Sequence, residues 1–142
     1  MERAKFPNFK QHKKNDCGPC SLLIISRFYG MKYSFNYLKR KFKLTGNGVT
    51  LSSISSVAKS IGFTTVGVKI KMDKLQAISF PCIVHWLNNH FIVVYKITSK
   101  YAYVSDPAVG LIKYSILEFA KGFTNNNVKK KKEGIVLIFS KN

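Results

Sequence analysis

The sequence predicts an α+β fold in which N-terminal helices pack on a mainly antiparallel sheet. Apolar residues recur at helical intervals between residues 18 and 61, whereas β-branched and polar residues alternate from residue 63 onward. A chain of 142 residues that is 46% hydrophobic is also long enough to bury one sizeable core. We therefore expect a single domain over residues 1–142.

Three helices are expected in the first half of the chain. The first covers residues 18–29 and ends at Gly30, because glycine suits a left-handed C-cap. The second covers residues 34–41, and the third follows a capping residue at Thr50 or Ser52. In each of them the apolar residues return every three or four positions, which is typical of a helix with one buried face.

Six segments of the second half have the alternating pattern and β-branched composition of strands. They are residues 63–70, 80–86, 90–97, 101–106, 110–115 and 134–140. A short helix over residues 115–121 interrupts the series. Most separators are short enough for hairpins, so each strand should pair antiparallel with its neighbour in the sequence.

The charge balance points to an anionic partner. The chain has 24 Lys and Arg residues against six Asp and Glu residues, and its formal net charge of +18 creates a positive potential over most of the surface. These residues are scattered, and the single run, at residues 129–132, is interpreted as a solvated loop. A basic nucleic-acid-binding module is therefore one alternative function.

Cysteine usage and hydropathy favour a reducing compartment. The three cysteines cannot all pair within the chain, and the first residues lack the apolar stretch of a secretory signal. The longest apolar runs fall far short of the ~20 residues that cross a bilayer as a helix. We expect that this chain alone does not span a membrane.

The segment "NDCGPC", residues 15–20, places a cysteine at the start of the first helix. Asn15 or Asp16 is a suitable N-cap, so Cys17 falls in the first turn, where unpaired N–H groups and the helix dipole favour a thiolate. A carboxylate aimed at the sulfur would oppose this ionisation, so Asp16 should cap the helix or face away. Burial in the core, the usual fate of a free cysteine, suits Cys20 and Cys82.

The cysteine spacing allows two other interpretations of Cys17. Together with Cys20, Cys82 and His85 it nominally forms a Cys₃His zinc site. Positions three apart in a strand point to opposite faces, however, which disfavours the second pair as ligands. A redox pair of the thioredoxin type would need a strand before the first cysteine, and here a polar segment precedes it.

A reactive thiol needs a base and an orienting group from elsewhere in the chain. His90 opens a strand directly after a polar turn, where an imidazole can be partly exposed and still held in place. Asp106 ends the next strand, so a hairpin would bring the two side chains together, although an Asp-Pro pair is also a common turn starter. His85 lies inside an apolar strand, and His12 lies in the irregular start, where we expect it to be exposed.

Three blocks of the sequence resemble a known family. "QHKKNDCGPC" at 11–20, "HWLNNHFIVV" at 85–94 and "DPAVG" at 106–110 are similar to the signature blocks of the C39 cysteine peptidases. These are papain-like domains at the N-termini of peptidase-containing ABC transporters that export bacteriocins and related peptides. The blocks occur in the family's order and cover nearly the whole chain, so the resemblance implies a papain-like cysteine peptidase fold.

The resemblance also implies a role for four residues. Cys17 would be the nucleophile, His90 the general base and acid, and Asp106 the group that orients His90. Gln11 would lend its side-chain amide to an oxyanion hole completed by the backbone N–H of Cys17. No cofactor or metal is implied.

A function follows from the same resemblance. Family members remove leader peptides after a double-glycine-type motif, coupled to export by the transmembrane and ATPase domains of the transporter, on the cytoplasmic side of the bacterial plasma membrane. An amphipathic leader helix would need an apolar surface on the helical half, for which the candidates are Met31, Tyr33, Phe35 and Tyr37. The positive charge would then face anionic lipids or acidic leader segments, and no nucleic acid is expected.

Several alternatives stay open on the sequence. The chain has no phosphate-binding G-x-x-x-x-G-K-[ST] motif, so we expect an excised domain or a stand-alone relative. Another papain-like hydrolase, such as a deubiquitinase-like enzyme or an amidase, would share the same residue types. A non-proteolytic peptide-binding module is disfavoured because Cys17 is present.

Overall fold

The computed structural model describes residues 5–43, 49–87, 90–124 and 133–142. Its helices are α1 (Cys17–Phe28), α2 (Phe35–Lys43), α3 (Leu51–Ser60) and α4 (Ile116–Phe123), with short 3₁₀ turns η1 (Lys14–Asp16) and η2 (Met72–Ala77). Its strands are β1 (Phe63–Lys71), β2 (Cys82–Trp86), β3 (His90–Ile97), β4 (Tyr101–Asp106), β5 (Gly110–Ser115) and β6 (Glu133–Lys141). The predicted lysine loop at 129–132 and the turn at 88–89 lie outside the described residues.

Local capping explains where the helices begin and end. Thr50 caps α3 through a reciprocal pair of hydrogen bonds with Ser53, so Thr50 rather than Ser52 is the capping residue. Ser115 caps α4 in the same way together with Glu118. Gly30 follows α1 with a φ of 81°, the left-handed conformation that glycine adopts without steric cost.

The strands form one antiparallel sheet in the order β1-β6-β2-β3-β4-β5. The hairpin series from β2 to β5 confirms the predicted pairing of neighbours. The prediction for β1 was wrong, because β1 pairs with β6 from Phe63 opposite Lys141 to Lys71 opposite Glu133. Strand β6 lies between β1 and β2, and the 3₁₀ turn Met72–Ala77 is the segment that carries the chain from β1 to β2 past it.

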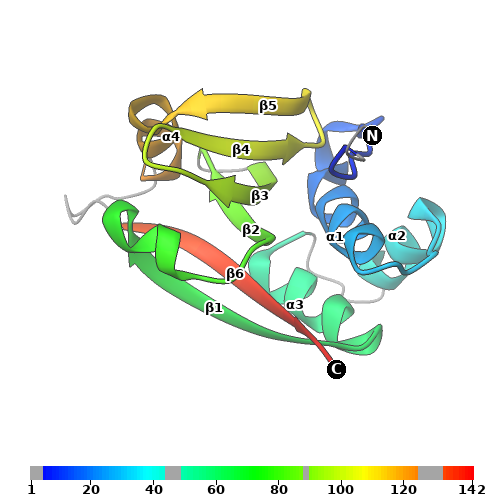
Figure 1. The fold of residues 1–142 in the computed structure, drawn as a ribbon. Coiled ribbons are helices and arrows are strands. Elements are labelled where there is room, and N and C mark those ends of the chain that lie inside the picture. Colours follow the sequence, from blue (N-terminus) through cyan, green and yellow to red (C-terminus); the bar gives the residue numbers. More distant parts are fainter. Residues whose placement is uncertain (1–4, 44–48, 88–89, 125–132) are drawn as a thin grey trace.

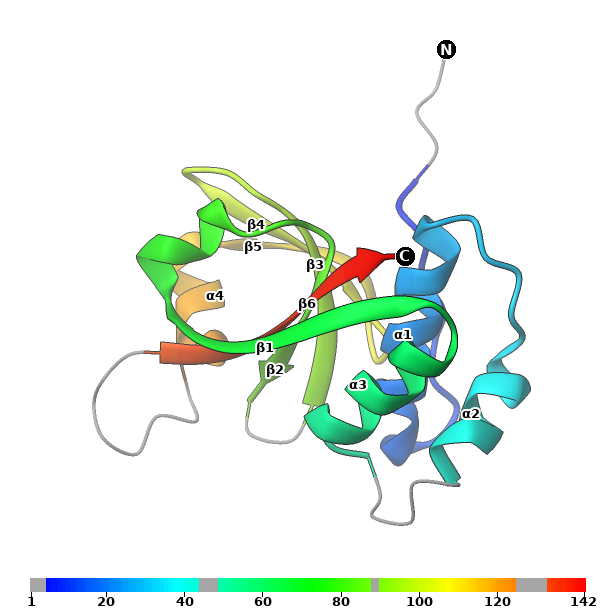
Figure 2. The same cartoon turned by 90° about the horizontal axis from the view of Figure 1, so that it is seen from below.

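Alternate residues of the central strands contribute to two hydrophobic clusters on opposite faces of the sheet. Ile83 and Val93 join the cluster formed with α1, α2 and α3. Val84 and Ile92 join the other cluster, with Phe119 of α4. Figures 1 and 2 show the result: the three N-terminal helices lie on one side of the sheet and α4 on the other.

None of the described helices combines the length and the apolar character needed to cross a bilayer.

Candidate active site

Cys17 is the first residue of α1 and is 5% exposed. The turn η1 leads directly into the helix, so the sulfur lies at the end where backbone N–H groups have no partner within the helix. These groups and the helix dipole favour negative charge on the sulfur. The sequence prediction for the position of Cys17 is confirmed.

His90 and Asp106 meet across the β3–β4 pair. His90 is the first residue of β3 and Asp106 is the last residue of β4. Because the two strands run antiparallel, these two strand ends lie side by side. His90 Nε2 donates to Asp106 Oδ1 at 2.7 Å. This contact leaves the other ring nitrogen of His90 without a carboxylate partner, and Cys17 lies close enough to the imidazole to help raise its pKa. The structure therefore brings the three predicted residues together.

The surroundings of His90 favour its protonated form. Burial alone would lower the pKa of His90, but the hydrogen bonds and charges of Asp106 and Cys17 outweigh it and raise the pKa to about 9. A thiol and an imidazole in this arrangement can exchange a proton and form a thiolate–imidazolium pair.

Asp106 has two local functions at once. Its Oδ1 atom accepts from the backbone N–H of Ala108 at 2.8 Å as well as from His90, and its carbonyl accepts from Val109 at 3.2 Å. The side chain is buried, so these donors stabilise its charge. The turn-starting and the orienting interpretations of Asp106 are therefore compatible.

The segment before α1 is fastened to the Asp106 turn by hydrogen bonds that the sequence did not reveal. Asn8 Nδ2 donates to Ser105 Oγ at 2.9 Å and to the Asp106 carbonyl at 3.3 Å, while Ser105 donates to the Pro7 carbonyl at 2.7 Å. The Gln11 backbone N–H donates to the Pro107 carbonyl at 2.8 Å. A serine inside an apolar strand was the one available signal, since buried hydroxyls require partners.

Gln11 carries a buried polar atom with no protein partner. Its Oε1 atom makes no hydrogen bond to the described part of the chain. Buried polar atoms are rarely left unsatisfied without a functional reason. The carboxamide of Gln11 is therefore available to a ligand.

Asp16 does not cap α1, so the capping part of the prediction for this residue was wrong. Its side chain makes no capping hydrogen bond to α1. Instead Oδ1 lies 3.1 Å from the Nζ atom of Lys39, which projects from α2. Because the carboxylate is buried, it needs this cation more than an exposed carboxylate would.

The remaining cysteines and histidines do not assemble a second centre. Cys82 belongs to the cluster on the α4 side of the sheet, whereas Cys17 belongs to the cluster on the opposite side. No group of three or more candidate ligands in the described ranges is placed to hold a metal ion, which contradicts the zinc interpretation. His85 stacks on Phe91, and His12 is exposed as expected.

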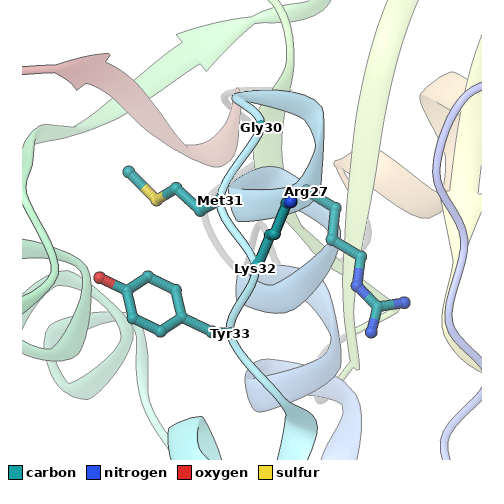
Figure 3. A pocket seen from close by; sticks show the side chains of 5 residues that line it. All are labelled: Arg27, Gly30, Met31, Lys32 and Tyr33. Atoms are coloured by element: carbon teal, nitrogen blue, oxygen red, sulfur yellow. The ribbon is translucent and has the colours of Figure 1, made fainter.

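Figure 3 shows a hollow beside the opposite end of α1. Cys17 is the first and Phe28 the last residue of this 12-residue helix, so the two ends lie about 16 Å apart. The hollow is therefore distinct from the candidate active site. It is lined by Arg27, Gly30, Met31, Lys32 and Tyr33.

The sequence of this chain matches a known protein family. Residues 5–133 match the model of the peptidase C39 family. The chain belongs to this family. The resemblance seen in the three sequence blocks is thus confirmed.

Curated relatives of this C39 family member are long transport proteins. The colicin V secretion/processing ATP-binding protein CvaB of Escherichia coli is 32% identical over 122 residues, which cover 86% of this chain and 18% of the relative. The pediocin PA-1 transport/processing ATP-binding protein PedD of Pediococcus acidilactici is 33% identical over 122 residues, covering 80% and 17%. The chain spans less than a fifth of the length of these relatives.

Solved structures share the fold of this C39 family member. A double glycine motif protease from an AMS/PCAT transporter, in complex with the leader peptide, matches with a TM-score of 0.85 and 31% identity, over 99% of this chain and 94% of that one. The peptidase domain of Streptococcus ComA matches with a TM-score of 0.82 and 26% identity, over 97% and 100%. The predicted fold, N-terminal helices on an antiparallel sheet, is confirmed.

The raised pKa of His90 predicts a pH-dependent contribution to stability. A group whose pKa rises from 6.5 to about 9 on folding stabilises the folded state fully below pH ~6.5, and the stabilisation disappears as the pH rises through about 9. The difference in free energy of unfolding between wild type and His90→Gln should therefore be largest near pH 6 and shrink toward pH 10. Urea unfolding at four pH values would measure it. A difference that stays constant or grows with pH would contradict the assignment.

Proposed function

We propose that this chain is a cysteine endopeptidase that removes leader peptides after a double-glycine-type motif from bacteriocins or related secreted peptides. The observation that carries the proposal is the contact of Cys17, His90 and Asp106 at the start of α1. Membership of the peptidase C39 family and the 31% identity to a double glycine motif protease give the substrate class.

The geometry supports a two-step acyl transfer. The Cys17 thiolate attacks the carbonyl of the scissile peptide bond, and the protonated His90 gives its proton to the leaving amine. A water molecule, deprotonated by His90, then hydrolyses the thioester and restores the thiol. Asp106 keeps Nε2 of the imidazole occupied, so the other ring nitrogen faces the sulfur in both steps.

Gln11 completes the reaction centre in this proposal. The tetrahedral intermediate carries a negative oxygen, which the side-chain amide of Gln11 and the backbone N–H of Cys17 would stabilise. The hydrogen bond from the Gln11 backbone N–H to the Pro107 carbonyl holds this residue beside the Asp106 turn. The side-chain Nε2–H₂ is the group that would donate to the oxyanion. A donor of this kind contributes ~2.7 to 4 kcal/mol to lowering the barrier.

The leader is proposed to bind the helical half of the chain. Met31 and Tyr33 line the hollow of Figure 3, and Phe35 lines a second hollow that also includes Asp16. Tyr37 is exposed on α2 and stacks on Tyr33. Partly buried apolar side chains that remain accessible suit the apolar face of an amphipathic helix.

The biological setting is also a proposal. The named relatives are secretion, transport and processing ATP-binding proteins, and a soluble peptidase module of such a protein would act beside its transmembrane and ATPase domains. We place the module on the cytoplasmic side of the bacterial plasma membrane. The single domain over residues 1–142 would require no cofactor.

Replacement of Cys17 tests the proposed nucleophile. Cys17→Ala should lower the rate of cleavage of a double-glycine leader peptide by more than about 10⁴-fold, because no other group can form the acyl intermediate. Mass spectrometry of the peptide products would measure the rate. Cys20→Ala, which removes a buried thiol one turn away, is the matched control and should retain cleavage. Cleavage by Cys17→Ala would remove the proposed nucleophile.

The role of Gln11 predicts a selective loss of turnover. Gln11→Ala should reduce kcat by about 10²- to 10³-fold with little change in KM, since the donor acts on the transition state. The control is Asn15→Ala, which removes an exposed amide from the same segment. Equal kinetics for the two variants would exclude an oxyanion role for Gln11.

The net charge of +18 predicts that binding to anionic partners depends on salt. Affinity of Cys17→Ala for an acidic leader peptide and for vesicles that contain anionic lipid should fall several-fold as NaCl increases, because added ions screen the attraction. Fluorescence anisotropy and vesicle sedimentation would measure the two affinities. Binding that does not change with salt would show that the charge has another role. Tighter binding to RNA or DNA than to either partner would favour the nucleic-acid alternative.

A further inference from the structure

A buried carboxylate lies beside the proposed nucleophile without taking part in the reaction. Asp16 directly precedes Cys17 and its side chain is 4% exposed. It makes no capping hydrogen bond, so the free N–H groups of α1 do not satisfy it. A buried negative charge on the residue next to a thiol disfavours the thiolate, which is the reactive form. Some other group must offset the charge of Asp16.

Lys39 is placed to do so. Its Nζ atom lies 3.1 Å from Asp16 Oδ1, and its side chain is 27% exposed. The ammonium also lies over the ring of Phe35, 5.6 Å from the ring centre, which limits its freedom. Phe35 and Lys39 are one helical turn apart on α2, so the packing of this helix against α1 decides where the cation lies.

The influence of the pair extends to the sulfur atom of Cys20 in the first turn of α1. Burial and the nearby charges of Asp16 and Cys17 raise the pKa of the Cys20 thiol to about 12, whereas Lys39 acts in the opposite direction. Cys20 lies one turn beyond Cys17, farther along the chain from Asp16. The two members of the pair therefore exert opposing fields at the end of the helix that holds the nucleophile.

We propose that Lys39 is a positioning residue that holds Asp16 in an ion pair, offsets its charge, and thereby preserves the reactive thiolate of Cys17. The inference rests on the proposed function in taking Cys17 as the nucleophile. The other charged or titratable groups near the sulfur are His90, whose pKa Cys17 helps to raise, Asp106 behind His90, and Cys20.

Other groups of the adjoining hollow complete the surroundings of Asp16. His12, Lys13 and Arg27 line this hollow together with Asp16 and Lys39. Lys13 and Arg27 add a diffuse positive potential, but an ion pair at contact distance has a far larger effect than a more distant, solvated charge. Removal of Lys39 should therefore have an effect that removal of another lysine from the same helix does not have.

The pH dependence of Cys17 alkylation tests the proposal. The rate of iodoacetamide modification, followed by mass spectrometry of the Cys17 peptide, rises with the thiolate fraction and gives a midpoint pH for each variant. In Lys39→Met the midpoint should move about one pH unit higher than in wild type, because the carboxylate is left uncompensated. In Lys39→Arg it should stay at the wild-type value. In Asp16→Asn the midpoint should fall, and adding Lys39→Met to Asp16→Asn should not bring it above wild type.

Lys41→Met is the matched control. Lys41 is on the same helix, but its ammonium lies over the ring of Tyr37, so its loss should leave the midpoint unchanged. Equal midpoints for Lys39→Met and Lys41→Met would overturn the proposal. So would an Asp16→Asn/Lys39→Met double variant that keeps the upward shift of Lys39→Met, since Lys39 would then act without Asp16.

The test remains decisive if one variant does not fold, and it can be separated from the test of peptide cleavage. If Lys39→Met does not fold, Asp16→Asn decides alone, and a midpoint that is unchanged or higher than in wild type overturns the proposal. Because the readout is alkylation, the inference is separate from peptide cleavage. If the alkylation midpoints shift as expected but the wild-type chain does not cleave the peptide, only the proposed function is wrong. If the chain cleaves the peptide but the midpoints do not shift, only the role of Lys39 is wrong.

Discussion

The hydrogen bond between His90 and Asp106 is the interaction on which the candidate site depends. It joins the start of β3 to the end of β4, two adjacent strands inside the sheet, and its 2.7 Å length fixes the orientation of the imidazole against the buried carboxylate. The same carboxylate accepts from the turn that follows β4. A change in the strand register would therefore disturb the base, the turn and the contact with Cys17 together.

Around this hydrogen bond the chain satisfies buried polar groups with partners from distant segments. The segment before α1 reaches back to the end of β4 through Asn8 and Gln11, although nearly one hundred residues separate Asn8 from Ser105. These bonds join the helical side of the molecule to the sheet at the point where Cys17 meets His90. The arrangement keeps the proposed nucleophile and its base on separate elements that cannot move apart without exposing unsatisfied donors and acceptors.

The helices and hairpins could be predicted because their signals are local. Apolar periodicity located α1, α2 and α3, and short polar turns identified the series from β2 to β5. The partner of β1 could not be found in this way, since β6 lies at the far end of the chain and no short turn joins the two. Pairing between distant strands depends on how the whole sheet buries its apolar residues, which a local pattern does not contain.

The sequence by itself determined the chemical inventory: a cysteine at a helix start, a histidine and an aspartate at strand ends, and motif blocks similar to the C39 peptidases. Only the tertiary structure decided which of these groups meet. It separated Cys82 from Cys17 across the sheet and gave Asp16 a lysine from α2 in place of a helix cap. The physical reason is that electrostatic and hydrogen-bond partners are selected by distance in space. That distance is set by the packing of α2 against α1 and of α1 against the sheet.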